Sequence, residues 1–452
     1  MIKNLTISAL LLFSATTGLA QGESTLYKTI KENYENKADS MVNAFIESFM
    51  IKSKGVFNDK YQQYANNAYW TQAHAMDVIV YCYERHKEDN KTLANKYKSY
   101  MNLWYANKAN NYSGSSASSS GTYTMFQNPY TDDMCWITLT LLHMNEATGT
   151  TKYYTAAKGI FDNYIIKRAQ EDEETDGLWL PWNTNGDGNG PNACTQSPAT
   201  LIAAKLYQKT NLEKYLTYAK KLYAYTAKKI VKSDGRVEEP PLTYTQGTFG
   251  EACRILYHVT DETPAIKNRY KTLAFQYISY AFTSGRCTNG QNILRHEGTS
   301  GDQSIFKAVL IPYAVNYVLD TEMPTSNRKA IAEYIQKNTK TLYANLKWDR
   351  YPIVFCNFDW TKPWTGEDKD ASMGAMCSGT SLLENTARMQ KAIIESYQDY
   401  QDFIEDIPAN IDIATTTGVY TIDGRLVRTP WQGTDNLPKG MYIINGKKVF
   451  LK

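Results

Sequence analysis

The segment LLHMNEATGTTKYYTAAK, residues 141–158, contains the pattern from which the fold can be predicted. An apolar helix ends near Thr148-Gly149, a tyrosine follows four or five residues later, and a second amphipathic helix begins. The same pattern recurs at residues 206–220, more loosely at 256–270 and weakly at 83–97. A regular spacing of about 50 to 60 residues per helical pair is typical of arrays whose neighbouring units bury one another's apolar faces.

Less regular segments extend this array to six helical pairs. Inner helices are expected to begin near Asn67, Asp132, Asn192, Gln246, Asp302 and Ser378. Six pairs predict an all-α fold, an (α/α)6 toroid in which the helical hairpins close into a ring. An open solenoid of the same hairpins is the competing geometry, and only contact between the first and last pairs distinguishes the two.

The two ends of the chain depart from the helical pattern. Lys3, an apolar run over residues 5–13 and Gly18-Leu19-Ala20 are typical of a secretion signal, which we assign to residues 1–20. After about residue 407, short strand-like runs are separated by Asp-Gly and Asn-Gly turns, which favour hairpins. We therefore expect a helical domain over residues 21–406 and a small β-rich tail over residues 407–452.

Charge and composition exclude several kinds of partner. The 49 basic and 46 acidic residues leave a net charge of +3, which gives no electrostatic reason to expect nucleic acid or an acidic membrane. No apolar run is long enough to cross a bilayer. The 35 tyrosines and 9 tryptophans suit core packing and stacking on the apolar faces of sugars. A neutral ligand fits better, and most of the aromatic residues are expected in the core.

In such a toroid the inner helices all run in the same direction, so their N-termini gather at one mouth of the barrel. The polar and aromatic residues expected near these helix starts are the candidate site. They are Trp70, Gln72, Asp132, Asp133, Trp179, Trp182, Asn192, Tyr244, Gln246, Asp302 and Gln303. Converging helix N-termini favour anionic groups, which would help to keep a nucleophilic carboxylate ionised.

The adjacent Asp132 and Asp133 have two interpretations. An aspartate before an apolar helical run is commonly a helix cap. Two neighbouring carboxyl groups also repel each other, which raises the proton affinity of one, and glycoside hydrolysis needs one ionised and one protonated carboxyl group. The catalytic interpretation therefore depends on the surrounding residues and not on the pair alone.

Other kinds of site have weaker support. His74, His143, His258 and His296 show no metal-ligand spacing. Residues 183–189 alternate like calcium ligands, but Cys194 occupies the twelfth position, where a closing glutamate belongs. Seven dispersed cysteines without a C-x-x-C pair argue against a thiolate zinc site. The acidic run 171–174 is expected at a solvated helix end, and we expect no metal and no cofactor.

Five motifs together resemble glycoside hydrolase family 76, the bacterial endo-α-1,6-mannanases, over about residues 60–320. The motifs are AYWTQAHA at 68–75, YTDD at 130–133 with Trp136, GLW at 177–179 followed by Asn192-Ala193, TYTQG at 243–247, and GDQ at 301–303 with Phe306-Lys307. Their order and spacing are far more specific than any single motif. This chain departs from the family in having Cys135-Trp136 where two tryptophans often follow the aspartates, which affects the expected subsite lining.

The resemblance implies an (α/α)6 barrel and a retaining mechanism on α-1,6-linked mannose. Asp132 matches the family's nucleophile and Asp133 its acid/base. The implied partner is mannan or a manno-oligosaccharide, and we expect a monomer in the periplasm or at the cell surface of a Gram-negative bacterium. The β-rich tail resembles C-terminal segments, including sorting domains, of exported Bacteroidetes proteins.

Two classes of alternative stay open at this point. Another activity on the same toroid is one: a transglycosidase like the fungal cell-wall relatives of the family, a different glycosidase or a sugar epimerase. A glycan-binding or scaffold protein that keeps the fold without turnover is the other. Product analysis separates transfer from hydrolysis, and binding of unbranched α-1,6-mannan without release of reducing ends would identify a binding protein.

Overall fold

The computed structural model of the chain describes residues 22–63, 69–111, 126–184, 190–238, 242–405, 419–421, 426–428, 439–444 and 447–451. The segment assigned as a secretion signal lies outside these residues, as do residues 185–189 of the loop with calcium-like spacing. Residues 32–390 form one compact unit, and residues 1–31 with 391–452 form a second.

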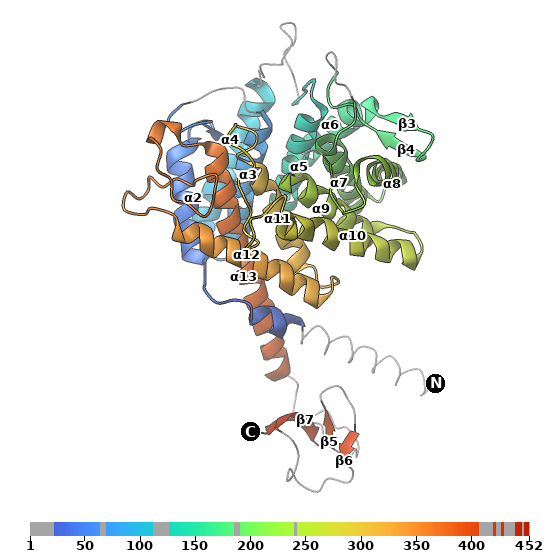
Figure 1. The fold of residues 1–452 in the computed structure, drawn as a ribbon, viewed down its shortest axis with the longest axis vertical. Coiled ribbons are helices and arrows are strands. Elements are labelled where there is room, and N and C mark those ends of the chain that lie inside the picture. Colours follow the sequence, from blue (N-terminus) through green and yellow to red (C-terminus); the bar gives the residue numbers. More distant parts are fainter. Residues whose placement is uncertain are drawn as a thin grey trace. The chain divides into compact units, whose positions relative to one another are not determined.

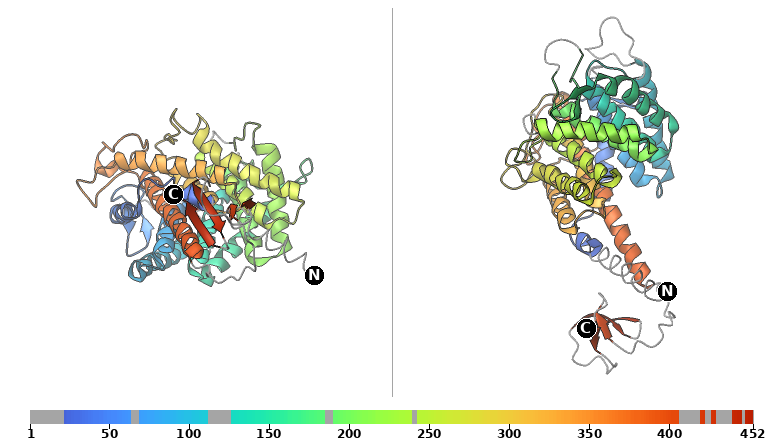
Figure 2. Two further views of the ribbon diagram at one scale, coloured as in Figure 1. Left: turned by 90° about the horizontal axis from the view of Figure 1, so that it is seen from below. Right: turned by 90° about the vertical axis from the view of Figure 1, so that its right-hand side faces the viewer.

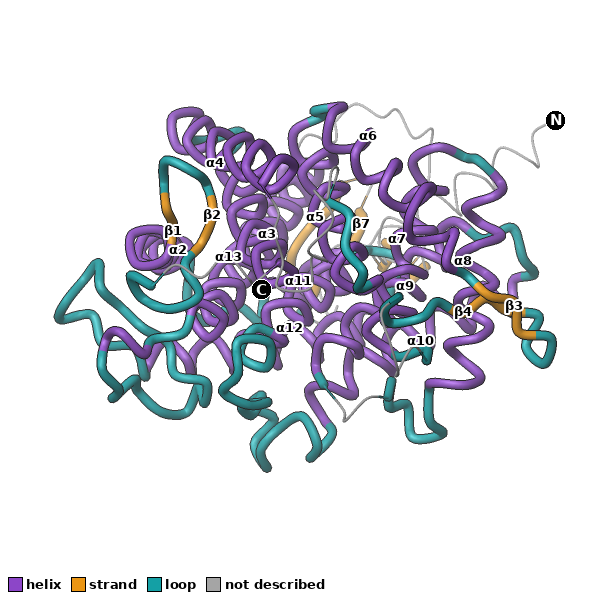
Figure 3. Tube along the Cα trace, turned by 90° about the horizontal axis from the view of Figure 1, so that it is seen from above, coloured by secondary structure: helices purple, strands orange, loops and turns teal. Residues whose placement is uncertain are grey.

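The large unit is an (α/α)6 toroid of inner and outer helices (Figures 1 and 3). The inner helices are α3 (Tyr69–His86), α5 (Thr131–Thr148), α7 (Ala193–Thr210), α9 (Thr243–Val259), α11 (Phe306–Leu319) and α13 (Met373–Glu405). The outer helices are α2 (Glu35–Phe49), α4 (Lys91–Asn111), α6 (Thr151–Ile160), α8 (Glu213–Tyr225), α10 (Pro264–Thr283) and α12 (Thr325–Ala344). The predicted fold class is confirmed, and each inner helix begins within a few residues of its expected start.

The repeated threonine and turn residue end the inner helices as expected. After α5, Gly149 adopts a left-handed conformation with φ 69°, and after α7, Asn211 does the same with φ 54°. The hydroxyl groups of Thr148 and Thr210 donate to the carbonyl oxygens four residues earlier, at 2.6 and 2.7 Å. A left-handed residue that closes a helix lets the chain turn back at once, so α5 and α7 are followed directly by the outer helices α6 and α8.

Burial distinguishes the two layers of helices. Along α6 the buried residues Tyr153, Ala156, Ala157 and Ile160 follow the helical period, so one face packs inward and the other meets solvent. Helix α9 is buried almost all round, from Thr243 to Tyr257. A Cβ atom at Gly247 of this helix would lie 2.8 Å from the Leu310 Cα atom, so α9 and α11 approach to a distance that only glycine permits.

The last inner helix closes the ring. Glu384 of α13 accepts two hydrogen bonds from Arg85 of α3, at 2.7 and 2.8 Å, and both side chains are fully buried. On its other side, α13 reaches α11, where Arg388 donates to Asn316 Oδ1 at 2.9 Å. Because α13 contacts both the first and the fifth inner helices, the array is a closed toroid and not an open solenoid.

Short antiparallel strands complete the structure. The strand β1 (Met50–Ile51) pairs with β2 (Val56–Phe57), and β3 (Gln170–Asp172) pairs with β4 (Gly177–Trp179). The prediction that residues 171–174 end a helix is therefore wrong: they enter a hairpin in which Gln170 lies opposite Trp179.

The predicted β-rich tail is present as a four-stranded antiparallel sheet. Its strands are β5 (Val419–Thr421), β6 (Leu426–Arg428), β7 (Gly440–Ile444) and β8 (Lys447–Leu451), in the order β6-β5-β7-β8 (red arrows in Figure 2). In the described part of the chain, no helix combines the length and the apolar character needed to cross a membrane.

Candidate active site

Residues from the N-terminal ends of four inner helices meet around the indole of Trp70. Its ring lies 6.4 Å from Trp136 of α5, 6.5 Å from Tyr244 of α9 and 5.7 Å from Phe306 of α11, measured between ring centroids. Tyr244 and Phe306 stack at 4.3 Å. The N-terminal mouth of the barrel therefore has an aromatic floor, on which Trp70 is half-buried and Tyr244 is buried.

Asp132 and Asp133 lie in the first turn of α5 beside this floor, and both are half-buried. The N-cap of the helix is Tyr130, so neither aspartate is the capping residue. The thiol of Cys194, in the first turn of α7, donates to Asp132 Oδ2 at 3.4 Å. The amide of Asn128 donates to Asp133 Oδ2 at 2.9 Å.

Asp133 is held in its protonated form by its surroundings. Burial raises the pKa of its carboxyl group well above the ordinary value, and the negative charges of Asp132 and Asp302 raise it further. The hydrogen bond from Asn128 opposes this shift but does not reverse it. Among the described residues Asp133 has no ion-pair partner. It therefore retains a proton at a pH at which an ordinary aspartate has lost it.

Asp302 lies across the mouth from the aspartate pair. It belongs to the exposed turn before α11, and its carboxylate accepts a hydrogen bond from Trp70 Nε1 at 2.7 Å. Gln303 follows in the same exposed turn. A hollow of about 240 Å³ adjoins Asp302. Its lining residues are Asp59, Thr71, Gly301, Asp302, Ser372, Met373 and Gly374.

The loop that contains Trp182 forms another side of the mouth. Trp182 is 37% exposed, and its ring packs on Tyr130 at 5.2 Å between centroids. Its carbonyl oxygen accepts a hydrogen bond from the Thr131 amide at 2.7 Å, which fastens the loop to the start of α5. Trp182 thus presents an open aromatic surface next to the aspartate pair.

The sequence profile of glycosyl hydrolase family 76 matches residues 29–396, which include all twelve toroid helices except the end of α13. The chain belongs to glycosyl hydrolase family 76. It is a glycoside hydrolase by family.

Solved structures with the same fold include other members of family 76. The α-1,6-mannanase GH76A of Salegentibacter sp. HEL1_6 is 23% identical, with a TM-score of 0.65, and the match covers 79% of this chain and 100% of that one. An inactive variant of the same enzyme was solved in complex with α-1,6-mannotetrose. A family 76 mannosidase from Bacteroides thetaiotaomicron is 18% identical, with a TM-score of 0.59 over 81% of this chain and 99% of that one. No curated protein sequence matches the chain.

Two of the predicted sugar-binding residues of this family 76 chain have structural partners instead. Gln72 is 1% exposed, and its amide both accepts from and donates to the main chain of Phe57 at 2.9 Å. Gln246 is fully buried and bonds the main-chain groups of Val237, Gly235 and Tyr277. The surface open to a sugar therefore excludes these two glutamines, although both lie in the first turns of inner helices.

Trp179 and Asn192 hold intermediate positions. Trp179 ends strand β4 and is half-buried. Asn192 is the N-cap of α7, and its side-chain oxygen accepts a hydrogen bond from the Thr195 amide at 3.0 Å. Its side chain is half-buried at the mouth, so it combines a capping role with a place near the aspartate pair.

Two residues that the sequence did not indicate, Asn128 and Arg168, hold the turn that carries the aspartate pair. Asn128 contacts Asp133 directly. Arg168, at the end of the short 3₁₀ helix η2 (Ile166–Arg168), donates to the carbonyl oxygens of Asn128 and Pro129 and to the hydroxyl of Thr131, each at 2.9 Å. The polar Asn128 before a helix start is a weak signal in the sequence, and nothing local marks Arg168.

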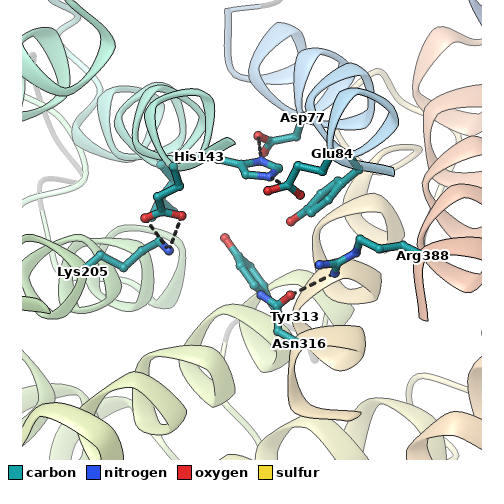
Figure 4. A pocket seen from close by; sticks show the side chains of 10 residues that line it. Asp77, Glu84, His143, Lys205, Tyr313, Asn316 and Arg388 are labelled. Atoms are coloured by element: carbon teal, nitrogen blue, oxygen red, sulfur yellow. Dashed lines mark hydrogen bonds and ion pairs between the residues drawn. The ribbon is translucent and has the colours of Figure 1, made fainter. Parts of the chain in front are cut away.

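The opposite mouth of the barrel is also polar, but its charges are paired (Figure 4). His143 lies between Asp77 at 3.0 Å and Glu84 at 3.3 Å, and Lys205 pairs with Glu146 at 3.0 Å, around a cavity of about 110 Å³. Burial disfavours the charged imidazole, yet the two carboxylates outweigh it and raise the pKa of His143 to about 9. This compensation contrasts with Asp133, whose charged neighbours are themselves acidic.

Histidines and possible metal ligands do not add a second centre near the aspartates. His74 is buried between Trp70 and Trp136, at 5.3 and 5.1 Å, and burial lowers its pKa to about 4, so it is a neutral core residue. Over the described ranges, no three histidine, cysteine, aspartate or glutamate side chains gather in a way that could hold a metal ion.

Proposed function

We propose that this family 76 chain is a retaining endo-α-1,6-mannanase in which Asp132 is the nucleophile and Asp133 the general acid and base. One observation carries the proposal. Two adjacent carboxyl groups share one helical turn at an aromatic mouth, and the surroundings of Asp133 keep a proton on it. An acid that keeps its proton beside a second carboxyl group is the arrangement that glycoside hydrolysis requires.

In the first step, the Asp132 carboxylate attacks the anomeric carbon and the glycosidic C–O bond breaks. Asp133 gives its proton to the departing oxygen, so the leaving sugar departs as a neutral alcohol. In the second step, Asp133 takes a proton from water, and the oxygen of that water attacks the anomeric carbon and displaces Asp132. Two inversions at the same carbon return the original configuration, and both carboxyl groups regain their starting states.

The substrate class follows from the surface around the pair. Trp70, Trp182 and Trp179 offer ring faces for the apolar faces of sugars. Asp302, Gln303 and Asn192 supply hydrogen-bonding groups for sugar hydroxyls. The hollow at Asp302 could take sugar units beyond the cleaved bond, which fits endo action. The mannotetrose bound by the Salegentibacter enzyme supports α-1,6-linked mannose as the sugar.

Sizing of the products from debranched yeast mannan tests the proposal. An endo-acting hydrolase releases a ladder of oligosaccharides, whose new reducing ends appear first as the α-anomer by NMR. Release of mannose alone would identify an exo-acting enzyme, products longer than the substrate would identify a transferase, and binding without new reducing ends would identify a binding protein.

Loss of the negative charge of Asp132 should abolish catalysis without abolishing binding. Asp132→Asn keeps the size of the side chain but removes the attacking charge, so turnover should fall by several orders of magnitude while mannan binding stays within a few-fold of wild type. Reducing-end release measures the first quantity and calorimetry with manno-oligosaccharides the second. A near-normal turnover rate in this variant would refute the assignment.

We also propose that residues 1–20 direct export and that the mature protein works as a monomer in the periplasm or at the cell surface. The charged, apolar and small-residue order of this segment supports export. N-terminal sequencing of protein recovered from periplasmic and surface fractions tests the cleavage site and the compartment, and light scattering tests the monomer.

A further inference from the structure

We infer that Asn128 is a positioning residue for the general acid: its amide holds Asp133 Oδ2 as an acceptor and so places the transferable proton on Asp133 Oδ1. The inference rests on the proposed function of Asp133. It assigns a task to a residue outside the aspartate pair, and it names the oxygen atom from which the proton leaves.

The orientation of the Asn128 amide is fixed by its other partner. Asn128 Oδ1 accepts a hydrogen bond from the main-chain N–H of Tyr130 at 2.8 Å. A main-chain N–H only donates, so the atom facing Tyr130 must be the oxygen. The NH₂ group therefore faces Asp133 Oδ2, at 2.9 Å, and the reversed amide would place two donors against each other.

This orientation decides which oxygen of Asp133 carries the proton. A protonated carboxyl group has one oxygen that accepts and one hydroxyl that donates. A proton on Oδ2 would point at the Asn128 NH₂ group and remove the hydrogen bond. With the proton on Oδ1, Oδ2 accepts from Asn128 without conflict.

The same hydrogen bond persists when Asp133 is ionised. The NH₂ group then donates to a carboxylate oxygen, which strengthens the bond because the acceptor is charged. The carboxyl group is thus held in one orientation through both chemical steps. Oδ1 gives the proton to the leaving oxygen and later takes one from water.

Asn128 is itself rigidly held, as this task requires. The residue is buried, at 1% exposure, and its carbonyl oxygen accepts from Arg168 Nη2 at 2.9 Å. Arg168 also fixes the next residues, through Pro129 O and Thr131 Oγ1. Three hydrogen bonds from Arg168 hold this segment, so the Asn128 amide stays directed at Asp133. A catalytic group needs such support from its surroundings.

The bond also moderates the proton affinity of the acid. Burial and the charges of Asp132 and Asp302 raise the pKa of Asp133, and the Asn128 hydrogen bond lowers it. Without that donor the acid would hold its proton more tightly and in either of two orientations. Loss of Asn128 should therefore change both the rate and its dependence on pH.

Two substitutions keep the turn and remove the donor. Asn128→Ser can still accept from the Tyr130 amide but is too short to reach Asp133. Asn128→Asp has the shape of asparagine and can also accept from Tyr130, but it sets an acidic oxygen against Asp133. The alkaline limb of the kcat/KM profile on α-1,6-mannan should move to higher pH in the serine variant and further in the aspartate variant. The serine variant should lose roughly tenfold to hundredfold in kcat, with KM little changed, as part of what a general acid contributes.

Arg168→Gln is the matched control. It loosens the same segment without removing the Asn128 NH₂ group, so its alkaline limb should move less than that of Asn128→Ser. An aryl α-mannoside with a good leaving group needs little protonation when its bond breaks. Bond cleavage in this substrate should be slowed much less by Asn128→Ser than cleavage of mannan, whereas Arg168→Gln should produce a smaller difference between the two substrates.

A serine-variant profile that superimposes on wild type, or equal losses on both substrates, would overturn the inference while leaving the mannanase proposal intact. If the wild-type chain does not cleave mannan, the proposed function fails, and titration of the ¹³C-labelled Asp133 carboxyl by NMR tests the positioning directly. Asp133→Asn assigns the signal. A midpoint that rises in Asn128→Ser supports the hydrogen bond, and an unchanged midpoint contradicts it.

Discussion

Asp133 and His143 are half-buried titratable groups near opposite ends of helix α5, yet they have opposite surroundings. The nearest charges to Asp133 are the carboxylates of Asp132 and Asp302, which hold its proton on. His143 lies between two carboxylates that hold its proton on by attraction. The first arrangement destabilises the ionised carboxylate of Asp133, whereas the second stabilises the charged imidazolium of His143.

Removal of one of these charges should shift the pH profile in a known direction. Asp302→Asn keeps an acceptor for the Trp70 indole but removes a negative charge that raises the pKa of Asp133. The acid then loses its proton more readily, so the alkaline limb of kcat should move to lower pH by a fraction of a unit to about one unit. This is opposite to the shift expected for Asn128→Ser. A limb that moves to higher pH, or not at all, would contradict this account of the charge.

The paired histidine should make stability depend on pH. The folded pKa of His143 is about 9, above its ordinary 6.5, so its stabilising contribution is complete below pH 6.5 and is lost as pH rises through 9. His143→Gln should therefore cost the most stability near pH 6, and the difference from wild type should shrink toward pH 10. Urea unfolding at a series of pH values measures it. A loss of stability in His143→Gln that grows with rising pH would contradict this role of the charged imidazole.

The sequence predicts the acidic residues of the site better than it predicts the residues that position them. The Asp132-Asp133 pair is visible because it is local and falls at a helix start. Arg168 lies about 35 residues away and reaches the pair only because the outer layer folds back over it. Gln72 and Gln246 show the reverse difficulty: their position in the first turn of a helix is predictable, but the direction of their side chains depends on neighbouring loops.

At the scale of elements, the close approach of α9 and α11 should make one glycine irreplaceable. Gly247→Ala would place a Cβ atom 2.8 Å from the Leu310 Cα atom, where main chain must move, and should cost about 1–3 kcal/mol in the free energy of unfolding. Gly159→Ala in α6 is the control, because a Cβ atom there meets nothing within 4 Å and alanine favours helix by up to about 1 kcal/mol. Equal effects of the two changes in denaturant unfolding would contradict the packing argument.

The helices themselves were predictable because their stop signals are local. Thr148-Gly149 and Thr210-Asn211 end α5 and α7 through a left-handed residue that the sequence displays directly. The start of α11 is less exact: it was expected near Asp302 but occurs at Phe306, because Asp302 belongs to a turn held against Trp70 of another helix. Local chemistry fixes where a helix ends, and tertiary contacts decide where an uncapped one begins.

At the scale of the whole molecule, closure of the ring depends on one buried ion pair. Glu384→Gln would remove the bidentate partner of the buried Arg85 guanidinium and leave Asp39 as its acidic partner, so it should cost up to about 3–5 kcal/mol in the free energy of unfolding. The exposed pair of Lys91 and Glu88 is the control, and Glu88→Gln should cost less than about 1 kcal/mol. Thermal and denaturant unfolding measure both. A small effect of Glu384→Gln would mean that apolar packing alone closes the ring.

Adjacency of Asp132 and Asp133 in one turn of α5 has a further consequence. One peptide unit fixes the spacing of their Cα atoms, so the two side chains start from one rigid turn and not from distant parts of the barrel. A widening of the mouth, or a movement of the loop that contains Trp182, would displace Asp132 and Asp133 together. Heating or mutation should therefore lower the rate of cleavage well before it changes the anomeric configuration of the released sugar.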